Sequence, residues 1–154
     1  MKPMLYAVMV LTSLAIGTAL AADPVVGSWQ LNAAKSSFRS GPAVKSQTRT
    51  YSQSGSKITL EIKSTGAGGK DITSHTTYQL DGKDYPVTGN PDYDSLSGKQ
   101  VSENKAEFTL KRGGKAIGMT NRTVSKDGKT LTTETKYTTA GGEKSETTLI
   151  FDRQ

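Results

Sequence analysis

Apolar and polar side chains alternate along most of the chain after residue 43, and short turn signals interrupt the alternation at regular intervals. Segment 57–63 is the clearest case, because Ile58, Leu60 and Ile62 fall on one face of an extended chain. Threonine, a β-branched residue that favours pleated structure over helix, is abundant in the same region. The pattern predicts antiparallel strands with one apolar face and one solvated face.

Glycine-containing turns such as Asp81-Gly82 and Gly113-Gly114 divide the chain into short segments. An apolar face on every strand is hidden most economically when the sheet closes into a barrel, and the short connections favour an up-and-down meander over a Greek-key sandwich. We therefore predict an all-β, antiparallel barrel of about 8 to 10 strands, with one helical turn in the irregular connection 33–42. The predicted strands are 25–32, 44–53, 56–65, 71–80, 84–88, 95–102, 105–112, 115–125, 129–139 and 144–152.

Residues 1–21 differ in composition from the rest of the chain. Lys2 precedes a long apolar run, which ends in the small residues Ala19 and Ala21. This order is typical of a secretory signal peptide, and the run is shorter than the roughly 20 residues that a membrane-spanning helix needs. We expect cleavage after Ala21, a single barrel domain over 22–154, no stable membrane insertion, and a periplasmic or secreted location.

The net charge of +6 raises the question of an acidic partner. Lysine and arginine are scattered singly along the chain and rarely come closer than the pair Lys111 and Arg112. Scattered charges are typical of a solvated surface, so we expect no nucleic-acid partner. The absence of cysteine excludes disulfides and thiol chemistry, and the oligomeric state is left open.

The motif Gly27-Ser28-Trp29 at the start of the first predicted strand resembles the Gly-x-Trp signature of the calycins, which include lipocalins and fatty-acid-binding proteins. Segments 81–91 and 124–131 are similar to small exported bacterial lipocalin-like proteins. The resemblance implies a closed barrel in which an arginine lies over Trp29. Arg153 is one candidate, because closure pairs the first strand with the last, and Arg122 is the other.

The alternation assigns a largely apolar set of side chains to the barrel interior. Small inward residues such as Ser74 and Thr133 leave room, so the interior is either a cavity or a core filled by side chains. Two tyrosines near predicted turns, Tyr85 and Tyr93, are candidates for a rim. The candidate ligand-binding residues are Tyr78, Phe108, Met119, Tyr137, Leu149 and Phe151.

The chain departs from the fatty-acid-binding proteins at its last strand. That family usually carries an Arg-x-Tyr pair there, which clamps a carboxylate, whereas this chain has Leu149 and Phe151 at the corresponding places. A buried carboxylate without such donors is costly to desolvate. We therefore predict a ligand that is neutral or keeps its charge at the mouth of the barrel.

The sequence offers little for catalysis. Its only histidine, His75, alternates with inward residues and is expected to face solvent, so we predict a protein that is not an enzyme and has no cofactor. The oxygen ligands of Asp92 and Asp94 are spaced as in a cation loop, but no closing glutamate follows, so we predict no metal site.

Two functions remain. The first is a carrier of a small apolar molecule in the lumen, and the alternative is a non-catalytic envelope protein that acts through its surface around a filled barrel. A lumen of roughly 300 Å³ or more favours the carrier, and a packed interior favours the surface role.

Overall fold

The computed structural model describes residues 20–41 and 43–154. The predicted signal peptide therefore lies outside the described residues, except for Leu20 and Ala21. Within the described part of the chain, no helix has the length and apolar character that crossing a membrane requires.

The described residues form eleven strands and one short 3₁₀ helix. The elements are β1 (Gly27–Leu31), η1 (Ala33–Lys35), β2 (Ser37–Ser40), β3 (Val44–Ser54), β4 (Lys57–Gly66), β5 (Asp71–Tyr78), β6 (Asp81–Thr88), β7 (Ser95–Ser102), β8 (Lys105–Arg112), β9 (Lys115–Val124), β10 (Thr130–Thr138) and β11 (Lys144–Arg153).

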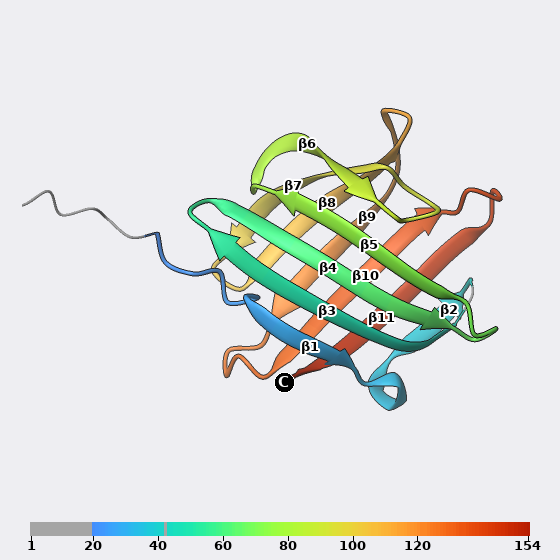
Figure 1. Cartoon of the computed structure of the whole chain (residues 1–154), viewed down its shortest axis with the longest axis horizontal. Helices are drawn as coiled ribbons and strands as arrows, with labels where there is room; N and C mark the ends of the chain where they lie inside the picture. Colours follow the sequence, from blue (N-terminus) through green and yellow to red (C-terminus); the bar gives the residue numbers. More distant parts are fainter. Residues whose placement is uncertain (1–19, 42) are drawn as a thin grey trace, which may run out of the picture.

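The strands form one antiparallel sheet that closes on itself (Figure 1). Consecutive strands from β3 to β11 pair with one another, and β1 pairs with both β3 and β11. The predicted closed up-and-down barrel is thus confirmed, with ten strands in the barrel and β2 as an extra strand. Strand β2 pairs with β11 next to the segment that β1 covers.

The structure differs from the prediction at β2 and β6. The predicted helical turn in the connection 33–42 is present as η1, but β2 follows it. Strand β2 contains a single apolar residue, Phe38, so it has no alternation for a pattern to detect. Strand β6 begins at Asp81, three residues earlier than predicted, because Asp81 already pairs with Lys99 of β7, and β6 pairs with β5 only at its end.

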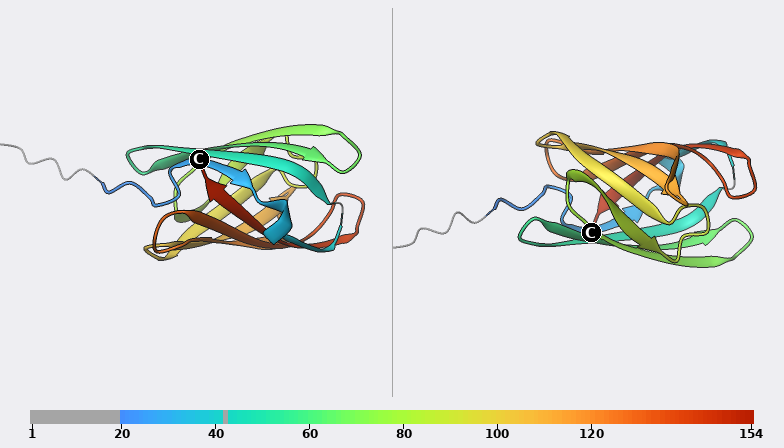
Figure 2. Two further views of the ribbon diagram at one scale, coloured as in Figure 1. Left: turned by 90° about the horizontal axis from the view of Figure 1, so that it is seen from below. Right: turned by 90° about the horizontal axis from the view of Figure 1, so that it is seen from above.

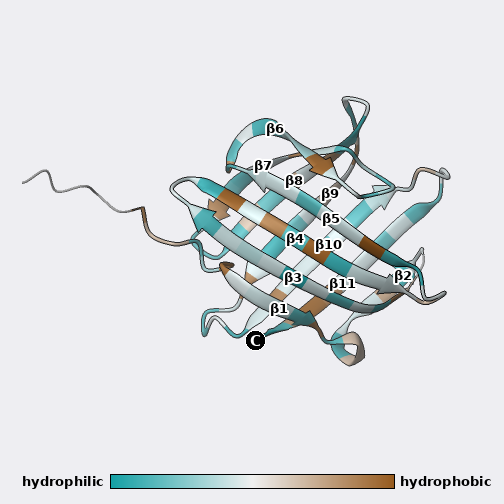
Figure 3. Cartoon of the chain, in the orientation of Figure 1, coloured by the Kyte–Doolittle hydropathy of each residue, from teal (hydrophilic) through white to brown (hydrophobic). Residues whose placement is uncertain are grey.

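The barrel is flattened, so that its two sides face each other as two layers (Figure 2). Strands β3 to β5 lie in the front layer of Figure 1, and β8 to β11 lie behind them. Apolar and polar positions alternate along β4 (Figure 3), where Ile58 and Leu60 are buried while Lys57 and Thr59 are exposed. The alternation therefore separates the interior of the barrel from solvent, as the sequence predicts.

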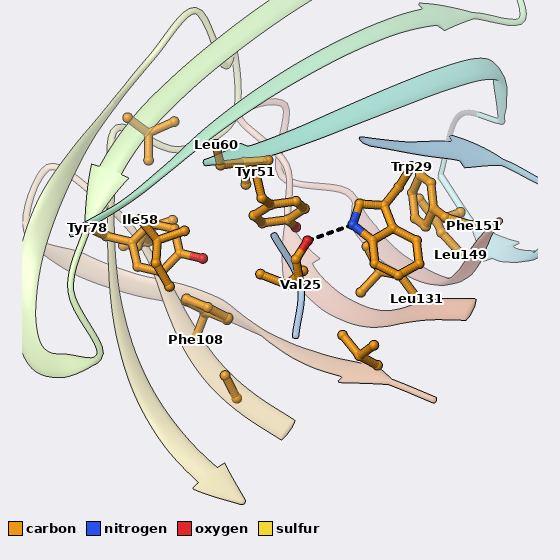
Figure 4. Close-up of a cluster of buried hydrophobic side chains, with 14 of the residues drawn as sticks. Val25, Trp29, Tyr51, Ile58, Leu60, Tyr78, Phe108, Leu131, Leu149 and Phe151 are labelled. Atoms are coloured by element: carbon orange, nitrogen blue, oxygen red, sulfur yellow. Dashed lines mark hydrogen bonds between the residues drawn. The ribbon is translucent and has the colours of Figure 1, made fainter. Parts of the chain in front are cut away.

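One end of the barrel is closed by a packed cluster around Trp29 (Figure 4). The Trp29 indole is fully buried together with Leu131 and Phe151. Its Nε1 donates a hydrogen bond of 2.7 Å to the carbonyl oxygen of Val25, which lies in the turn before β1. The buried N–H is therefore satisfied, and the indole holds the amino-terminal turn across this end.

Arg153 lies over Trp29 from outside the cluster. Trp29 and Arg153 are direct partners in the β1–β11 pairing, and the guanidinium carbon lies 4.1 Å from the ring centroid. The guanidinium also donates to the carbonyl oxygens of Val26 (2.7 Å) and Pro24 (2.6 Å). Of the two arginines considered for this position, Arg153 is confirmed, and the stack and the hydrogen bonds fix the amino-terminal turn to the last strand.

Gly27 makes this stack possible. Its φ of +133° is strained for any residue with a side chain, and a Cβ atom there would lie 2.6 Å from a terminal nitrogen of Arg153. The Gly-x-Trp motif thus combines a close approach by the arginine with a large ring for it to cover.

Candidate functional site

Above the closed end the barrel is hollow. A cavity of about 500 Å³ lies in the lumen and is lined by side chains from most of the barrel strands. Its mouth lies between the β4–β5 turn, which contributes Ala67 and Lys70, and the β6–β7 connection, which contributes Asn90 to Tyr93. Of the two interiors that the sequence left open, the structure has the hollow one, in the size range of small-molecule sites.

One wall of the cavity is built by β9, β10 and β11 and carries hydroxyl groups. The inward side chains of these strands lie in register: Thr120 pairs with Thr135, and Thr135 pairs with Thr147. Thr133 belongs to the adjacent inward row on one side of these three threonines, and Ser145 belongs to the adjacent inward row on the other side. We call these five residues, Thr120, Thr133, Thr135, Ser145 and Thr147, the hydroxyl wall; all five line the cavity.

Across the lumen the cavity has an aliphatic wall, formed by Leu60 and Ile62 of β4 and Ile72 of β5. These strands lie in the layer that faces β9 to β11 (Figure 1). Leu96 and Leu110 extend the apolar lining onto β7 and β8. The cavity is therefore amphipathic: its β9–β11 side is rich in hydroxyl groups but includes Leu149, and its β4–β5 side is mainly branched hydrocarbon but includes Ser64 and Ser74.

Arg122 is the buried charge of the site. It lies on β9 with 2% of its surface exposed, and its guanidinium forms an ion pair of 2.7 Å with Asp23, which precedes β1. A second terminal nitrogen donates to the phenol oxygen of Tyr78 at 3.0 Å, and the guanidinium lies 5.6 Å from the centroid of the Phe108 ring. The charge is thus compensated inside the protein, as a buried cation requires.

A second arginine, Arg49 of β3, also lines the cavity. Its guanidinium lies 4.7 Å from the centroid of the Phe151 ring, and its Nε donates to the Gln47 side chain at 2.8 Å. Among the described residues no carboxylate forms an ion pair with it. Neither Arg49 nor Arg122 is among the predicted ligand-binding residues, because that set rests on apolar and aromatic character, and the sequence considers Arg122 only as a partner of Trp29.

Three tyrosines of the lining, Tyr78, Tyr93 and Tyr137, have raised pKa values, and Tyr78 and Tyr137 make hydrogen bonds to charged side chains. Burial raises the pKa of Tyr78 far above its ordinary value, although the neighbouring Arg122 acts in the opposite direction. Burial, together with the carboxylate of Asp92, raises the pKa of Tyr137 to about 12. The Tyr137 hydroxyl donates to that carboxylate at 3.0 Å. Both phenols are therefore neutral at physiological pH and available as hydrogen-bonding groups.

Four of the predicted ligand-binding residues line the cavity: Tyr78, Phe108, Tyr137 and Leu149. Phe151 does not, because it belongs to the packed cluster at the closed end. The rings of Tyr78 and Phe108 meet edge to face in a T-shaped contact with centroids 5.3 Å apart. This pair forms part of the boundary between the cavity and the closed end.

The predicted inward position of Met119 is wrong, since 52% of its surface is exposed. A regular two-residue hairpin would pair Leu110 with Ile117 and Phe108 with Met119, which would turn Met119 inward. In the structure Leu110 pairs with Gly118, and the register shifts by one residue at that point. A one-residue shift reverses the faces of a strand, so Met119 turns outward and Arg122 turns into the lumen.

Only one of the two predicted rim residues lies at the mouth of the cavity. Tyr93 lines the cavity at its mouth, where its ring meets Tyr137 edge to face with centroids 6.4 Å apart. Tyr85 does not line the cavity; its hydroxyl donates to Asp81 on the same strand at 2.8 Å. The rim is therefore made by the β6–β7 connection and not by β6 itself.

The residues considered for catalysis and metal binding have other partners. His75 faces outward, as predicted, with Glu61 beside it at 3.6 Å. Asp92 accepts hydrogen bonds from Tyr137 and from the amide of Ala140, and Asp94 accepts one from the amide of Gly113. Within 20–41 and 43–154, no three histidine or acidic side chains are grouped closely enough to hold a metal ion.

No protein-family profile matches the chain, and no curated protein matches it. A solved structure described as EF1p2_mFAP2b bound to DFHBI is similar, with 10% identity and a TM-score of 0.53 over 85% of this chain and 94% of that chain. A redesigned barrel, mFAP1, also bound to DFHBI, has 15% identity and a TM-score of 0.48, over 84% and 95% of the two chains. The first similarity supports the barrel fold, and identities this low carry no information on the ligand.

Proposed function

We propose that this protein is an exported, non-catalytic carrier that binds a small, mainly apolar molecule in its barrel lumen, in the periplasm or outside the cell. The observation that carries the proposal is the cavity of about 500 Å³ inside a closed barrel. A barrel of similar fold is described as bound to the small molecule DFHBI, which supports the use of such a lumen as a container. The alternative, a protein that acts through its surface, is favoured by a filled interior, and this interior contains a cavity.

The ligand that we propose is neutral. Leu149 occupies an inward position on the last strand, where an anion clamp would be expected, and the charge of Arg122 is already paired with Asp23. Arg49 is the one lining residue near the closed end that argues for an anion, because no carboxylate of the described residues pairs with it. A comparison of two matched ligands separates these possibilities.

The first experiment is native mass spectrometry of the protein purified from its own cell envelope. We expect a small molecule to travel with the wild-type protein. Ser74→Phe places a ring in the cavity from β5 and should abolish this retention, whereas Thr73→Phe, on the exposed face of the same strand, should not. Equal retention by both variants would place the ligand outside the lumen and contradict the proposal.

The second experiment tests the charge of the ligand. 1-Dodecanol and dodecanoate have the same chain length, and we expect the alcohol to displace a neutral fluorescent probe from the lumen at the lower concentration. Stronger displacement by dodecanoate, lost in Arg49→Met, would overturn the neutral-ligand proposal and identify Arg49 as an anion site.

A further inference from the structure

We propose that the hydroxyl wall recognises oxygen atoms along one edge of the ligand, so that the lumen selects neutral molecules with hydroxyl or carbonyl groups over pure hydrocarbons. The inference rests on the proposed lumenal binding and adds the chemical class of the ligand. It depends on three observations: the register of the hydroxyls in the wall, the unpartnered polar atoms of Thr133 and the neighbouring Arg122, and the compensated charge of Arg122.

The register places the hydroxyls in a compact array. Thr120, Thr135 and Thr147 lie side by side on three neighbouring strands, with the oxygens of Thr120 and Thr135 3.0 Å apart. A hydroxyl group can donate one hydrogen bond and accept two, so this mutual bond leaves free capacity on both residues. Thr147 makes no side-chain hydrogen bond within the described part of the chain. The row can therefore contact a ligand edge at several points.

Next to this row lie two polar atoms that have no hydrogen-bond partner among the described residues, the Thr133 hydroxyl oxygen and the Arg122 Nε. Thr133 and Arg122 are direct partners across β9 and β10, both are at least 98% buried, and both line the cavity. Buried polar groups are satisfied in most proteins, so a neighbouring unpaired donor and hydroxyl call for an acceptor from outside the chain. Both atoms are covered by neighbouring groups, so a ligand oxygen would supply this acceptor after a small turn of the Thr133 or Arg122 side chain toward the lumen.

The charge at the wall favours a neutral oxygen over a carboxylate. Arg122 contributes the positive charge, and Asp23 compensates it at 2.7 Å with only 9% of its own side chain exposed. The aliphatic wall of Leu60, Ile62 and Ile72 lies across the lumen and accepts the hydrocarbon body of the ligand. The two walls together fit a molecule with one oxygenated edge and one apolar face.

The test compares two fluorescent probes, prodan and diphenylhexatriene. Prodan is neutral and carries a ketone oxygen, and diphenylhexatriene is a hydrocarbon. The variant Thr133→Val, Thr147→Val removes two hydroxyls that make no side-chain hydrogen bond in the described structure, and valine keeps their shape. Thr132→Val, on the outward face of β10, is the matched control.

We expect the double variant to bind prodan about tenfold more weakly and diphenylhexatriene within about twofold of wild type, because only prodan loses hydrogen bonds. The emission of bound prodan should also shift to the blue, since a ketone that loses a hydrogen-bond donor emits at shorter wavelength. Thr132→Val should change the binding of neither probe.

An equal loss of binding for both probes, or no loss for prodan, would overturn the inference. Wild-type protein that binds diphenylhexatriene but not prodan would also overturn it. Binding of neither probe by wild type would overturn the proposed function and the inference with it.

Discussion

The closed end of the barrel and its cavity half are built from the same strands, but their inward side chains differ in size. On β10 and β11 the closed end receives Leu131 and Phe151, whereas the cavity half receives Thr135 and Thr147. A ten-stranded barrel is wide enough that threonines facing one another cannot meet across it. Side-chain volume along a single strand therefore decides where the barrel is a core and where it is a container.

The largest effect is expected from breaking the closed end. Trp29→Ala removes a fully buried indole that organises this cluster, and we expect the free energy of unfolding to fall by about 3–5 kcal/mol. Urea denaturation measures the change. Trp29→Phe retains an aromatic ring and should lose less; an alanine variant as stable as wild type would show that the closed end does not depend on packing.

The boundary between the two regions depends on the ion pair of Asp23 with Arg122. Asp23→Asn leaves a buried guanidinium without its countercharge, so we expect a loss of about 3 kcal/mol in the free energy of unfolding. The control is Asp84→Asn, whose ion pair with Lys111 is solvent-exposed on the Asp84 side and should contribute less than about 1 kcal/mol. Equal losses in the two variants would contradict the difference between the buried and the surface pair.

Alkaline pH tests the cavity half. An unfolded tyrosine loses its proton near pH 10, whereas the pKa of Tyr137 in the folded protein is about 12. Between these values the unfolded chain binds fewer protons than the folded one, so the free energy of unfolding falls as pH rises, by at most about 1.4 kcal/mol per pH unit for this residue. Denaturation from pH 9 to 12 should show a smaller slope for Tyr137→Phe. An unchanged slope would indicate that the phenol titrates normally.

The smallest effect is expected outside both regions. Met119→Gln changes an exposed side chain, and we expect the free energy of unfolding to change by less than about 0.5 kcal/mol. Retention of prodan should also be unchanged. A loss of binding comparable to that of a lumenal variant would show that Met119 faces the ligand after all.

Much of the fold could be predicted from the sequence, because strand alternation and glycine turns are local signals. The resemblance implied an arginine over Trp29 and left Arg153 and Arg122 as candidates, and the pairing of the first strand with the last identifies Arg153. The polar half of the cavity was only partly predictable. Threonines were recognised as small inward residues, but the rows they form depend on which residues face one another across β9 to β11.

The register of β9 was the main feature that the pattern could not supply. Strand β9 begins with an irregularity at Ile117. The next residue is Gly118, and a Cβ atom at Gly118 would collide with Tyr137. A single extra residue reverses the inward and outward faces of the strand. A prediction based on apolar character therefore selects Met119, whereas the residue that faces the lumen is Arg122. Residue type does not predict the inward position of Arg122, because arginine is ordinarily a surface residue.

By itself the sequence determined a closed antiparallel barrel, since one-sided strands joined by tight turns must bury their apolar faces against one another. Only the tertiary structure decided that the barrel is hollow, that a bulge turns Arg122 inward, and that Asp23, far away in the chain, neutralises it. The physical reason is that alternation is a property of neighbouring residues, whereas cavity volume and charge pairing depend on distances between strands that only closure brings together.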